Sequence, residues 1–220
     1  MTAPAPGPGV PPQRDPYHPP ARAVRRMARR YAGIFGVETV ESYLEECHTL
    51  LAARATVTDY LPLLAERFAA ERLDAIVRSR GPAAGAVPEV LFVCTENAGR
   101  SQLAAALLRG AATRSVRIHS AGTLPAEWID PVALRLMGES GLCPGAEFPK
   151  PLTHEVVAAA DVVVSLGCGD ACPVLPGRSY YDWDLPDLKG LDIESARSVR
   201  DGLARRVETL ARRLGYRAAV

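Results

Sequence analysis

Long apolar runs and net charge are both scarce in this chain of 220 residues. No apolar run reaches the roughly 20 residues that a membrane helix needs, and no apolar stretch follows a basic N-terminus as in a secretory signal. We therefore predict a cytoplasmic protein without a membrane partner. The formal net charge of +1 gives no support for nucleic-acid binding. The arginines near the N-terminus are interpreted as one solvated helix face: Arg22, Arg25, Arg26, Arg29 and Arg30.

Cysteine is scarce as well, and the five residues present are too few for a disulfide scaffold. Their number is also odd. In a reducing cytosol, paired cysteines are more often catalytic or metal-binding than structural. The hydrophobic fraction of 48% is enough for a packed core, so we expect a globular protein in which some of the cysteines carry chemistry.

The N-terminal third divides into a tail and a helical unit. Residues 1–20 are rich in Pro, Ala and Gly and predict a disordered tail. Apolar residues at helical spacing, with Thr58 as the cap of the last helix, predict three helices over 21–35, 37–54 and 58–80. A unit of about 60 residues has only a marginal core of its own. We therefore expect the three-helix bundle at 21–80 to be a dimerisation or docking domain.

After a Gly- and Pro-containing linker at 81–88, strand and helix patterns alternate. The predicted strands are 89–94, 116–120, 161–167 and 179–183, and the predicted helices are 101–112, 130–140, 153–159 and 192–214. The first and third strands are continuously apolar, which is typical of strands buried on both faces of a parallel sheet. Residues 88–220 thus predict an α/β domain with a doubly wound, parallel four-stranded sheet. In such folds ligands bind at the carboxyl ends of the strands, and Cys94 lies at one of these ends.

The stretch CTENAGRS, residues 94–101, follows directly from the first predicted strand. A strand-to-helix turn of this composition can point its backbone N–H groups inward and bind an anion at the helix N-terminus. We assign oxyanion binding to the residues that follow the cysteine: Thr95, Glu96, Asn97, Ala98, Gly99, Arg100 and Ser101.

Cys94 and Arg100 give this loop its predicted chemistry. Arg100 is a planar, two-pronged donor that fits a tetrahedral oxyanion. The same positive field favours the thiolate form of Cys94, and Ser101 can hydrogen-bond the sulfur. The loop therefore predicts a thiolate nucleophile held beside the oxyanion that it attacks.

The loop and several later stretches resemble one protein family. CTENAGRS is similar to the phosphate-binding loop of low-molecular-weight protein tyrosine phosphatases and of the arsenate reductases that share their fold. The resemblance continues through HSAGT at 119–123, ADVVVSLGCGDACPVLPG at 160–177, YYDWDLPDL at 180–188 and VRD at 199–201. The three-helix unit resembles the N-terminal extension of some actinobacterial arsenate reductases.

This resemblance implies a nucleophile and a general acid. In the family the loop cysteine, here Cys94, is the nucleophile. An aspartate in a downstream Asp-Pro segment protonates the leaving oxygen. The matching stretch is DWDLPDLKG, in which Asp187 is the best match. Leu188 stands where the family has proline, so Asp184 is the second candidate.

Cys168 and Cys172 distinguish between the two chemistries of the family. A phosphatase needs one thiol, whereas reduction of arsenate to arsenite takes two electrons from thiols that leave as a disulfide. In the three-cysteine reductases, one cysteine of such a pair attacks the first, and the second resolves that bond and leaves a disulfide for thioredoxin. The resemblance thus implies that Cys94, Cys168 and Cys172 reduce arsenate, for which phosphate or sulfate would be mimics. We expect a homodimer with no metal or other cofactor.

Three alternatives stay open. Some actinobacterial-type members resemble this chain in GCGDACP but transfer the arsenic to mycothiol, with mycoredoxin, and use only the loop cysteine. That subgroup carries lysine at the position of Arg100, so the arginine favours the relay. A tyrosine phosphatase would need neither Cys168 nor Cys172, and Trp128 falls where phosphatases carry an aromatic wall. An oxyanion sensor or scaffold would bind arsenate without turnover.

Overall fold

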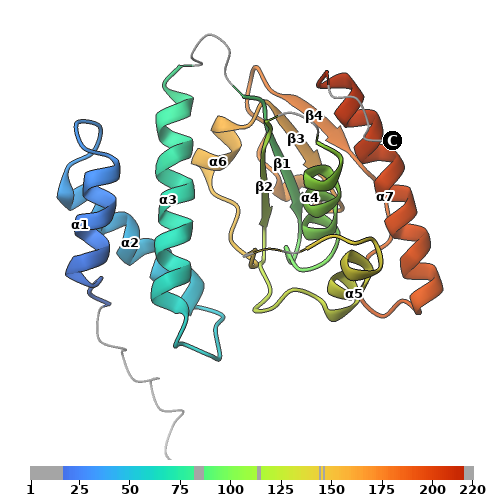
Figure 1. The fold of residues 1–220 in the computed structure, drawn as a ribbon, viewed down its shortest axis with the longest axis horizontal. Helices are drawn as coiled ribbons and strands as arrows, with labels where there is room; N and C mark the ends of the chain where they lie inside the picture. The colour runs from blue at the N-terminus through green and yellow to red at the C-terminus, as the bar shows by residue number, and fades with distance from the viewer. Residues whose placement is uncertain (1–16, 82–86, 113–114, 144, 146, 216–220) are drawn as a thin grey trace, which may run out of the picture.

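The computed structural model describes residues 17–81, 87–112, 115–143, 145 and 147–215. Most of the predicted tail, at 1–16, and most of the predicted linker, at 82–86, lie outside the described residues. Within them, a helical unit lies beside an α/β unit (Figure 1). None of the helices in these ranges is long and apolar enough to cross a membrane.

Four parallel strands form the sheet of the α/β unit. They are β1 (Glu89–Cys94), β2 (Arg117–Gly122), β3 (Val162–Ser165) and β4 (Ser179–Asp182), in the order β2-β1-β3-β4. In this register Val93 of β1 lies opposite Ala121 of β2 and Ser165 of β3. The apolar β1 is buried along its whole length, as a central strand covered on both faces should be. The predicted four-stranded parallel sheet is confirmed.

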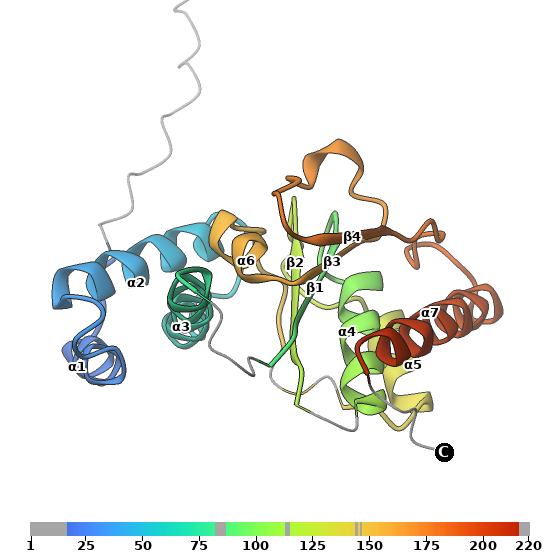
Figure 2. The ribbon, with the colours of Figure 1, turned by 90° about the horizontal axis from the view of Figure 1, so that it is seen from above.

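Helices cover both faces of this sheet (Figure 2). On one face lie α4 (Arg100–Ala111), α5 (Pro131–Glu139) and α7 (Ile193–Arg213), and on the other lies α6 (His154–Ala159). Successive side chains of β1 alternate between two cores. Phe92 packs in the core with Leu103 of α4, whereas Val93 packs in the core with Val157 of α6. This alternation places Cys94 on the α4 face.

The helical unit consists of α1 (Ala21–Arg30), α2 (Val37–Ala52) and α3 (Leu61–Ser79). Its core is formed by side chains at helical intervals, among them Leu44, Phe68 and Leu73. α3 lies alongside α6 of the α/β unit (Figure 1). There the buried Arg72 of α3 donates a hydrogen bond to Glu155 of α6 over 2.8 Å. The helical unit therefore uses one of its faces to pack on the α/β unit.

Two details of the predicted N-terminal helices are wrong. The first helix ends at Arg30 instead of residue 35: its cap residue Tyr31 leaves the helical conformation with a φ of −109°, and Gly33 follows with a φ of +78°. The third begins at Leu61 with Tyr60 at its cap position. This helix has no side-chain cap hydrogen bond, and Thr58 contributes its carbonyl oxygen instead, which accepts from the Leu61 amide over 3.0 Å. Both differences are confined to helix ends.

Candidate active site

The loop that follows β1 is held open by hydrogen bonds on its outer side. The carbonyl oxygens of Cys94, Thr95, Glu96 and Ala98 accept from the amides of Thr123, Leu124, Ala126 and Asp130, over 2.8 to 3.2 Å. With these carbonyls facing outward, the Asn97 amide faces inward and donates to Cys94 Sγ over 3.2 Å. Inward-facing amides at the start of a helix are an anion-binding arrangement.

Asn97 connects the parts of this loop. Among the described residues it is the only non-glycine with a positive φ, +49°, a conformation that asparagine tolerates better than most residues. Its Nδ2 donates to Ser101 Oγ over 2.9 Å, and its Oδ1 accepts from the Lys150 amide over 3.0 Å and from Gln102 Nε2 over 3.3 Å. Ser101 Oγ lies 2.9 Å from Cys94 Sγ. The buried thiol therefore has two hydrogen-bonding partners inside the loop.

Gly122, the last residue of β2, lets the loop pack against the sheet. A Cβ at this position would lie 2.7 Å from the Thr95 carbonyl oxygen and 2.9 Å from Asn97 Cβ. Both distances are too short for real side chains, so any larger residue would displace the loop. Gly122 belongs to the HSAGT stretch, which was recognised in the sequence only by its family resemblance and not by this contact with the loop.

Arg100 lies at the junction of three segments and is 8% exposed. Its guanidinium donates to the Leu185 carbonyl oxygen over 3.0 Å and pairs with the carboxylate of Asp187. A Cβ on Gly167 would lie 2.5 Å from Arg100 Nη1. Thr95 Oγ1 also donates to the Gly167 carbonyl oxygen, over 3.2 Å. The segment after β3 thus meets the oxyanion loop one residue before Cys168.

Of the two candidate general acids, Asp187 is the one that contacts the loop, through Arg100. Asp184 is exposed, and its backbone carbonyl accepts from Arg206 over 3.2 Å. Leu188, which replaces the expected proline, is fully buried and lies 3.4 Å from where a Cβ of Gly99 would be. This contact holds the aspartate segment against the loop. The geometry favours Asp187 as the acid, which remains a prediction.

Glu96 is part of the oxyanion loop by its backbone only. Its carbonyl oxygen takes part in the outer set of hydrogen bonds. Its side chain is 44% exposed and pairs with Lys189, with 3.0 Å between Oε1 and Nζ. This pairing partly neutralises a carboxylate that would otherwise repel an oxyanion.

Cys168 and Cys172 stand on either side of a short 3-10 turn, Gly169–Ala171. Both are free thiols; Cys168 is buried and Cys172 half-buried. The hydrogen bond from Cys172 lowers the pKa of Cys168 to about 7, and the same bond raises the pKa of Cys172. Cys168 is therefore the better nucleophile of the two near neutral pH.

A cluster of charged side chains lies between α3 and the edge of the sheet, and sequence reasoning missed it. Lys150 Nζ is 3.1 Å from oxygens of both Glu71 and Glu147. The ring nitrogens of His119 are each 2.6 Å from a carboxylate, of Glu71 on one side and of Glu89 on the other. Burial lowers the pKa of His119, but these carboxylates outweigh it and raise the pKa to about 9.

The charged cluster is a set of ion pairs and not a metal centre. The described residues contain no group of three or more His, Cys, Asp or Glu side chains that could hold a metal ion. The only sequence feature that pointed toward this cluster was the HSAGT stretch, which contains His119 but does not indicate the carboxylates that pair with it.

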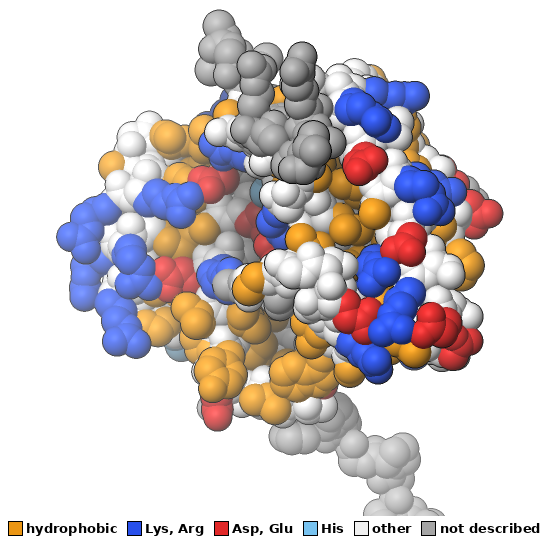
Figure 3. Space-filling model, turned by 45° about the vertical axis from the view of Figure 1, so that its right-hand side comes forward, with side chains coloured by type: hydrophobic (Ala, Val, Ile, Leu, Met, Phe, Trp, Pro, Cys, Tyr) orange, Lys and Arg blue, Asp and Glu red, His pale blue; other side chains and the backbone are white. Residues whose placement is uncertain are grey.

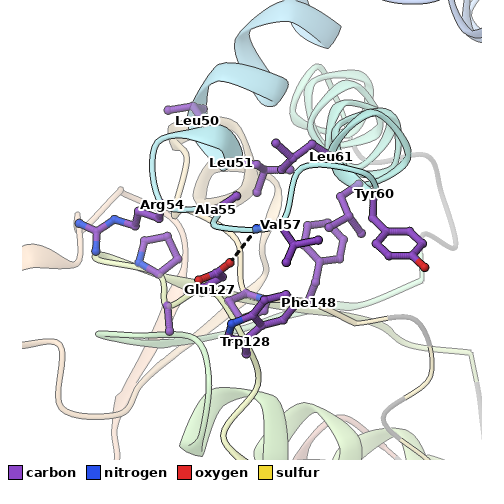
Figure 4. Close-up of a pocket in the computed structure, with 14 residues that line it drawn as sticks. Leu50, Leu51, Arg54, Ala55, Val57, Tyr60, Leu61, Glu127, Trp128 and Phe148 are labelled. Atoms are coloured by element: carbon purple, nitrogen blue, oxygen red, sulfur yellow. Dashed lines mark hydrogen bonds between the residues drawn. The ribbon is translucent and has the colours of Figure 1, made fainter. Parts of the chain in front are cut away.

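An apolar hollow of about 70 Å³ lies where both units meet (Figure 4), beside the segment whose Ala126 amide is bonded to the oxyanion loop. Leu51 and Tyr60 of the helical unit line it together with Trp128 and Phe148 of the α/β unit. Glu127 joins the two sides, because it accepts from the amide of Val57 over 3.3 Å. Figure 3 shows apolar side chains along the lower edge of the molecule, the end at which the strands have their carboxyl ends.

Comparison with known families decides what this loop is. A family model described as "Low molecular weight phosphotyrosine protein phosphatase" matches residues 89–219, which is more than half of the chain. The chain belongs to the low molecular weight phosphotyrosine protein phosphatase family. A second model, "Protein-tyrosine-phosphatase-like, N-terminal domain", matches residues 21–77. The family resemblance seen in the sequence is therefore confirmed for both units.

Individual relatives include both reductases and phosphatases. The solved structure of a thioredoxin-dependent arsenate reductase from Corynebacterium glutamicum is 41% identical, with a TM-score of 0.80, and the match covers 88% of this chain and 95% of that one. Arsenate reductase 1 of Staphylococcus epidermidis is 31% identical over 129 residues, 57% of this chain and 96% of that protein. An arginine phosphatase of Geobacillus stearothermophilus is 28% identical, with a TM-score of 0.51, over 58% of this chain and 93% of that one.

Proposed function

We propose that this protein reduces arsenate to arsenite, with Cys94 as the nucleophile and Cys168 and Cys172 as a disulfide relay. The observation that carries the proposal is a second pair of free thiols, Cys168 and Cys172, which begins one residue after Gly167, where the chain closely approaches Arg100. A phosphatase has no use for this second pair, whereas a reductase needs two electrons from thiols. The similarity over both units to a thioredoxin-dependent arsenate reductase supports the same reaction.

The first step is attack on the oxyanion. Arsenate has the shape and charge of phosphate, so the loop amides and Arg100 would hold its oxygens. The Cys94 thiolate attacks arsenic, a sulfur–arsenic bond forms, and one oxygen leaves as water with a proton from Asp187. Asp187 is paired with Arg100 in the structure. An oxyanion that takes the guanidinium frees this carboxyl to carry the proton.

The second step transfers the electrons. Cys168 attacks the Cys94 sulfur, a disulfide forms as the sulfur–arsenic bond breaks, and the bonding electron pair stays on arsenic, which leaves as arsenite. Cys172 then attacks Cys168 and releases Cys94 as a thiolate. The resulting Cys168–Cys172 disulfide is reduced by the dithiol of thioredoxin, in the reducing cytoplasm that we propose as the location. The lowered pKa of Cys168 supports the first attack.

Arsenate-dependent NADPH oxidation with thioredoxin and thioredoxin reductase tests the relay. We expect turnover by the wild type and by Cys143→Ser, the matched control at an exposed cysteine. Cys168→Ser and Cys172→Ser should both lose steady-state turnover. Undiminished turnover in Cys172→Ser would contradict the relay. If that turnover required mycothiol and mycoredoxin, the protein would be a mycothiol-dependent arsenate transferase.

A phosphatase is the second candidate function. It is favoured by the similarity to an arginine phosphatase and by Trp128, which is 59% exposed on the segment bonded to the loop. Hydrolysis of p-nitrophenyl phosphate should then continue in the double variant of Cys168→Ser and Cys172→Ser. Such hydrolysis, without arsenate reduction by the wild type under either reductant, would assign the chain to the phosphatases.

We also propose that the helical unit forms a homodimer through the turn between α1 and α2. Ile34 and Val37 in and after this turn are 45% and 51% exposed, and neighbouring exposed apolar side chains can form part of a protein–protein contact. Sedimentation should show a dimer for the wild type and a monomer for the double variant of Ile34→Ser and Val37→Ser. A wild-type monomer at micromolar concentration would contradict this proposal.

A further inference from the structure

The segment 147–150 lies between α3 of the helical unit and the oxyanion loop. On the side of the loop, the Lys150 amide donates to Asn97 Oδ1 over 3.0 Å, and the Phe148 carbonyl accepts from Gln102 over 3.1 Å. On the side of α3, the Lys150 ammonium is 3.1 Å from Glu71. The helical unit is thus connected to the interior of the oxyanion loop through one short segment.

Phe148 strengthens this connection by belonging to the core of the helical unit. It packs against the buried side chains of that core, although it lies in the α/β unit. The guanidinium of Arg67, on α3, lies 5.7 Å from the centre of its ring, within cation–π distance. The position of segment 147–150 is therefore fixed by α3 as much as by the sheet.

The Lys150 ammonium needs the α3 carboxylate because it is buried. Its side chain is 6% exposed, and that of Glu71 is 15% exposed. Burial lowers the pKa of Lys150, but the carboxylates of Glu71 and Glu147 outweigh this effect and raise the pKa. Removing one partner from a buried charge is costly because the charge that remains is poorly compensated. Without Glu71, Lys150 would keep only Glu147 as a carboxylate partner among the described residues, and its ammonium would be drawn toward that carboxylate and away from α3.

Two side chains, Asn97 and Ser101, connect the Lys150 amide to the Cys94 thiol through hydrogen bonds. Asn97, its acceptor, is in a left-handed conformation that its own hydrogen bonds support. Asn97 also donates to Ser101, which lies 2.9 Å from Cys94 Sγ. Displacement of Lys150 would therefore leave Asn97 free to turn, and Ser101 and the Asn97 amide would lose their alignment with the sulfur.

We propose that Glu71 and Lys150 are positioning residues of the active site, and that the helical unit is an integral part of the machinery that sets the reactivity of Cys94. Glu71 holds Lys150, Lys150 orients Asn97, and Asn97 aligns the donors around the thiol. The proposal rests on Cys94 being the reactive thiol and is independent of which oxyanion it attacks.

The test is the alkylation rate of each cysteine by iodoacetamide, followed by peptide mass spectrometry over a range of pH. In Glu71→Gln we expect Cys94 to react roughly tenfold more slowly near neutral pH. Exposed Cys143 serves as an internal reference and should keep its rate. The kcat for p-nitrophenyl phosphate should fall more than KM rises.

Glu66→Gln is the matched control for this substitution. Glu66 is also on α3 and pairs with Arg26 of α1, so its loss weakens the helical unit without touching segment 147–150. We expect Glu66→Gln to lower the melting temperature and leave the alkylation of Cys94 unchanged. If Glu71→Gln lowered the melting temperature in the same way, with an unchanged alkylation rate of Cys94, Glu71 would be merely structural and the proposal would be wrong.

A double-mutant cycle identifies the route of the coupling. If Glu71 acts through Lys150, then Lys150→Gln alone and the double variant should slow Cys94 equally, whereas additive effects would overturn the proposed route. Should Glu71→Gln fail to fold, Lys150→Gln breaks the same ion pair from the other side and is read in the same way. A fully reactive Cys94 in a protein without arsenate turnover would instead contradict the proposed function and leave this inference intact.

Discussion

The loop around Cys94 and the turn that carries Cys168 and Cys172 hold their thiols in opposite ways. Around Cys94, four backbone carbonyls are bonded on the outside, and Asn97 and Ser101 are bonded on the inside. The second pair stands on a single 3-10 turn, with glycines of positive φ at 167 and 169. Beyond this turn, Val174 is 76% exposed.

This difference matches the two tasks of the thiol relay that we propose. A nucleophile that must recognise a tetrahedral anion needs fixed geometry, because small displacements of the reacting atoms cost large factors in rate. A thiol that reacts first with Cys94 and then with Cys172 must change partners, which requires a segment that can rearrange. A phosphatase needs only the first kind of structure.

Gly167→Ala should disturb the rigid Cys94 loop more strongly than any other substitution considered, because it displaces Arg100. The added Cβ would lie 2.5 Å from Arg100 Nη1, whereas at Gly169 a Cβ meets nothing within 4 Å. Both glycines have positive φ, so both substitutions should cost about 1 kcal/mol of stability. We expect only Gly167→Ala to lower kcat/KM for p-nitrophenyl phosphate, by about 100-fold. Equal kcat/KM values for the two variants would show that Arg100 adapts.

The stability of the charged cluster that supports the Cys94 loop should depend on pH through His119. Its pKa in the folded protein is about 9, raised from 6.5, so its stabilising effect is complete below pH 6.5 and is lost as the pH rises through 9. Glu71, with its pKa lowered from 4.5 to about 2, acts in the opposite direction and stabilises above pH 4.5. Between pH 6.5 and 9 we expect the free energy of unfolding to fall by on the order of 2 kcal/mol.

Urea unfolding at pH 6.5 and pH 9 measures this loss, and His119→Gln is the control. Glutamine cannot titrate in this range, so the variant should be less stable than the wild type at pH 6.5 and should lose much less stability on going to pH 9. The same loss in both proteins would assign the pH dependence to other groups.

Cys172→Ala tests how the turn that carries Cys168 and Cys172 controls the reactivity of Cys168. The pairing with Cys172 lowers the pKa of Cys168, which increases the fraction of Cys168 that is thiolate near neutral pH. Without this donor the pKa should return toward its ordinary value, and alkylation of Cys168 at pH 7 should slow by about tenfold. Cys94 should keep its rate. Slowing of both thiols would show that the two sites are coupled before any substrate binds.

Glu96→Gln should have the smallest effect, although residue 96 lies in the middle of the loop. Its carboxylate forms an exposed pair with Lys189, and such pairs contribute little to stability. We expect a KM for p-nitrophenyl phosphate within about twofold of wild type and a stability change below about 0.5 kcal/mol. A large change in KM would mean that the side chain of Glu96 turns toward the bound anion.

Features encoded in contiguous stretches could be predicted from the sequence. The strands follow from apolar runs, and the loop from eight consecutive residues, so both are recognisable without tertiary contacts. The predicted helix ends were less accurate, as in α1, because the helix stops at Tyr31, a residue type that does not by itself mark a helix end. That Arg100 and Asp187 belong to the same site could be predicted only from the family resemblance.

The support behind the loop could not be predicted. Glu71 and Lys150 meet across a large separation in sequence, and charged residues at such positions are usually solvated. The contact of Lys150 with Asn97 is made by a backbone amide, which any residue except proline could supply. Nothing in the residue types at these positions therefore indicates that they meet.

The contacts of Gly99 and Arg100 with Leu188 and Leu185 have a consequence for biosynthesis. The oxyanion loop is translated before the middle of the chain, yet Leu185 lies 85 positions after Arg100. During synthesis from the N-terminus, the helical unit and β1 emerge first, while Cys94 still lacks these contacts around its loop. A nascent chain on the ribosome therefore holds an incomplete site until nearly the whole protein has emerged.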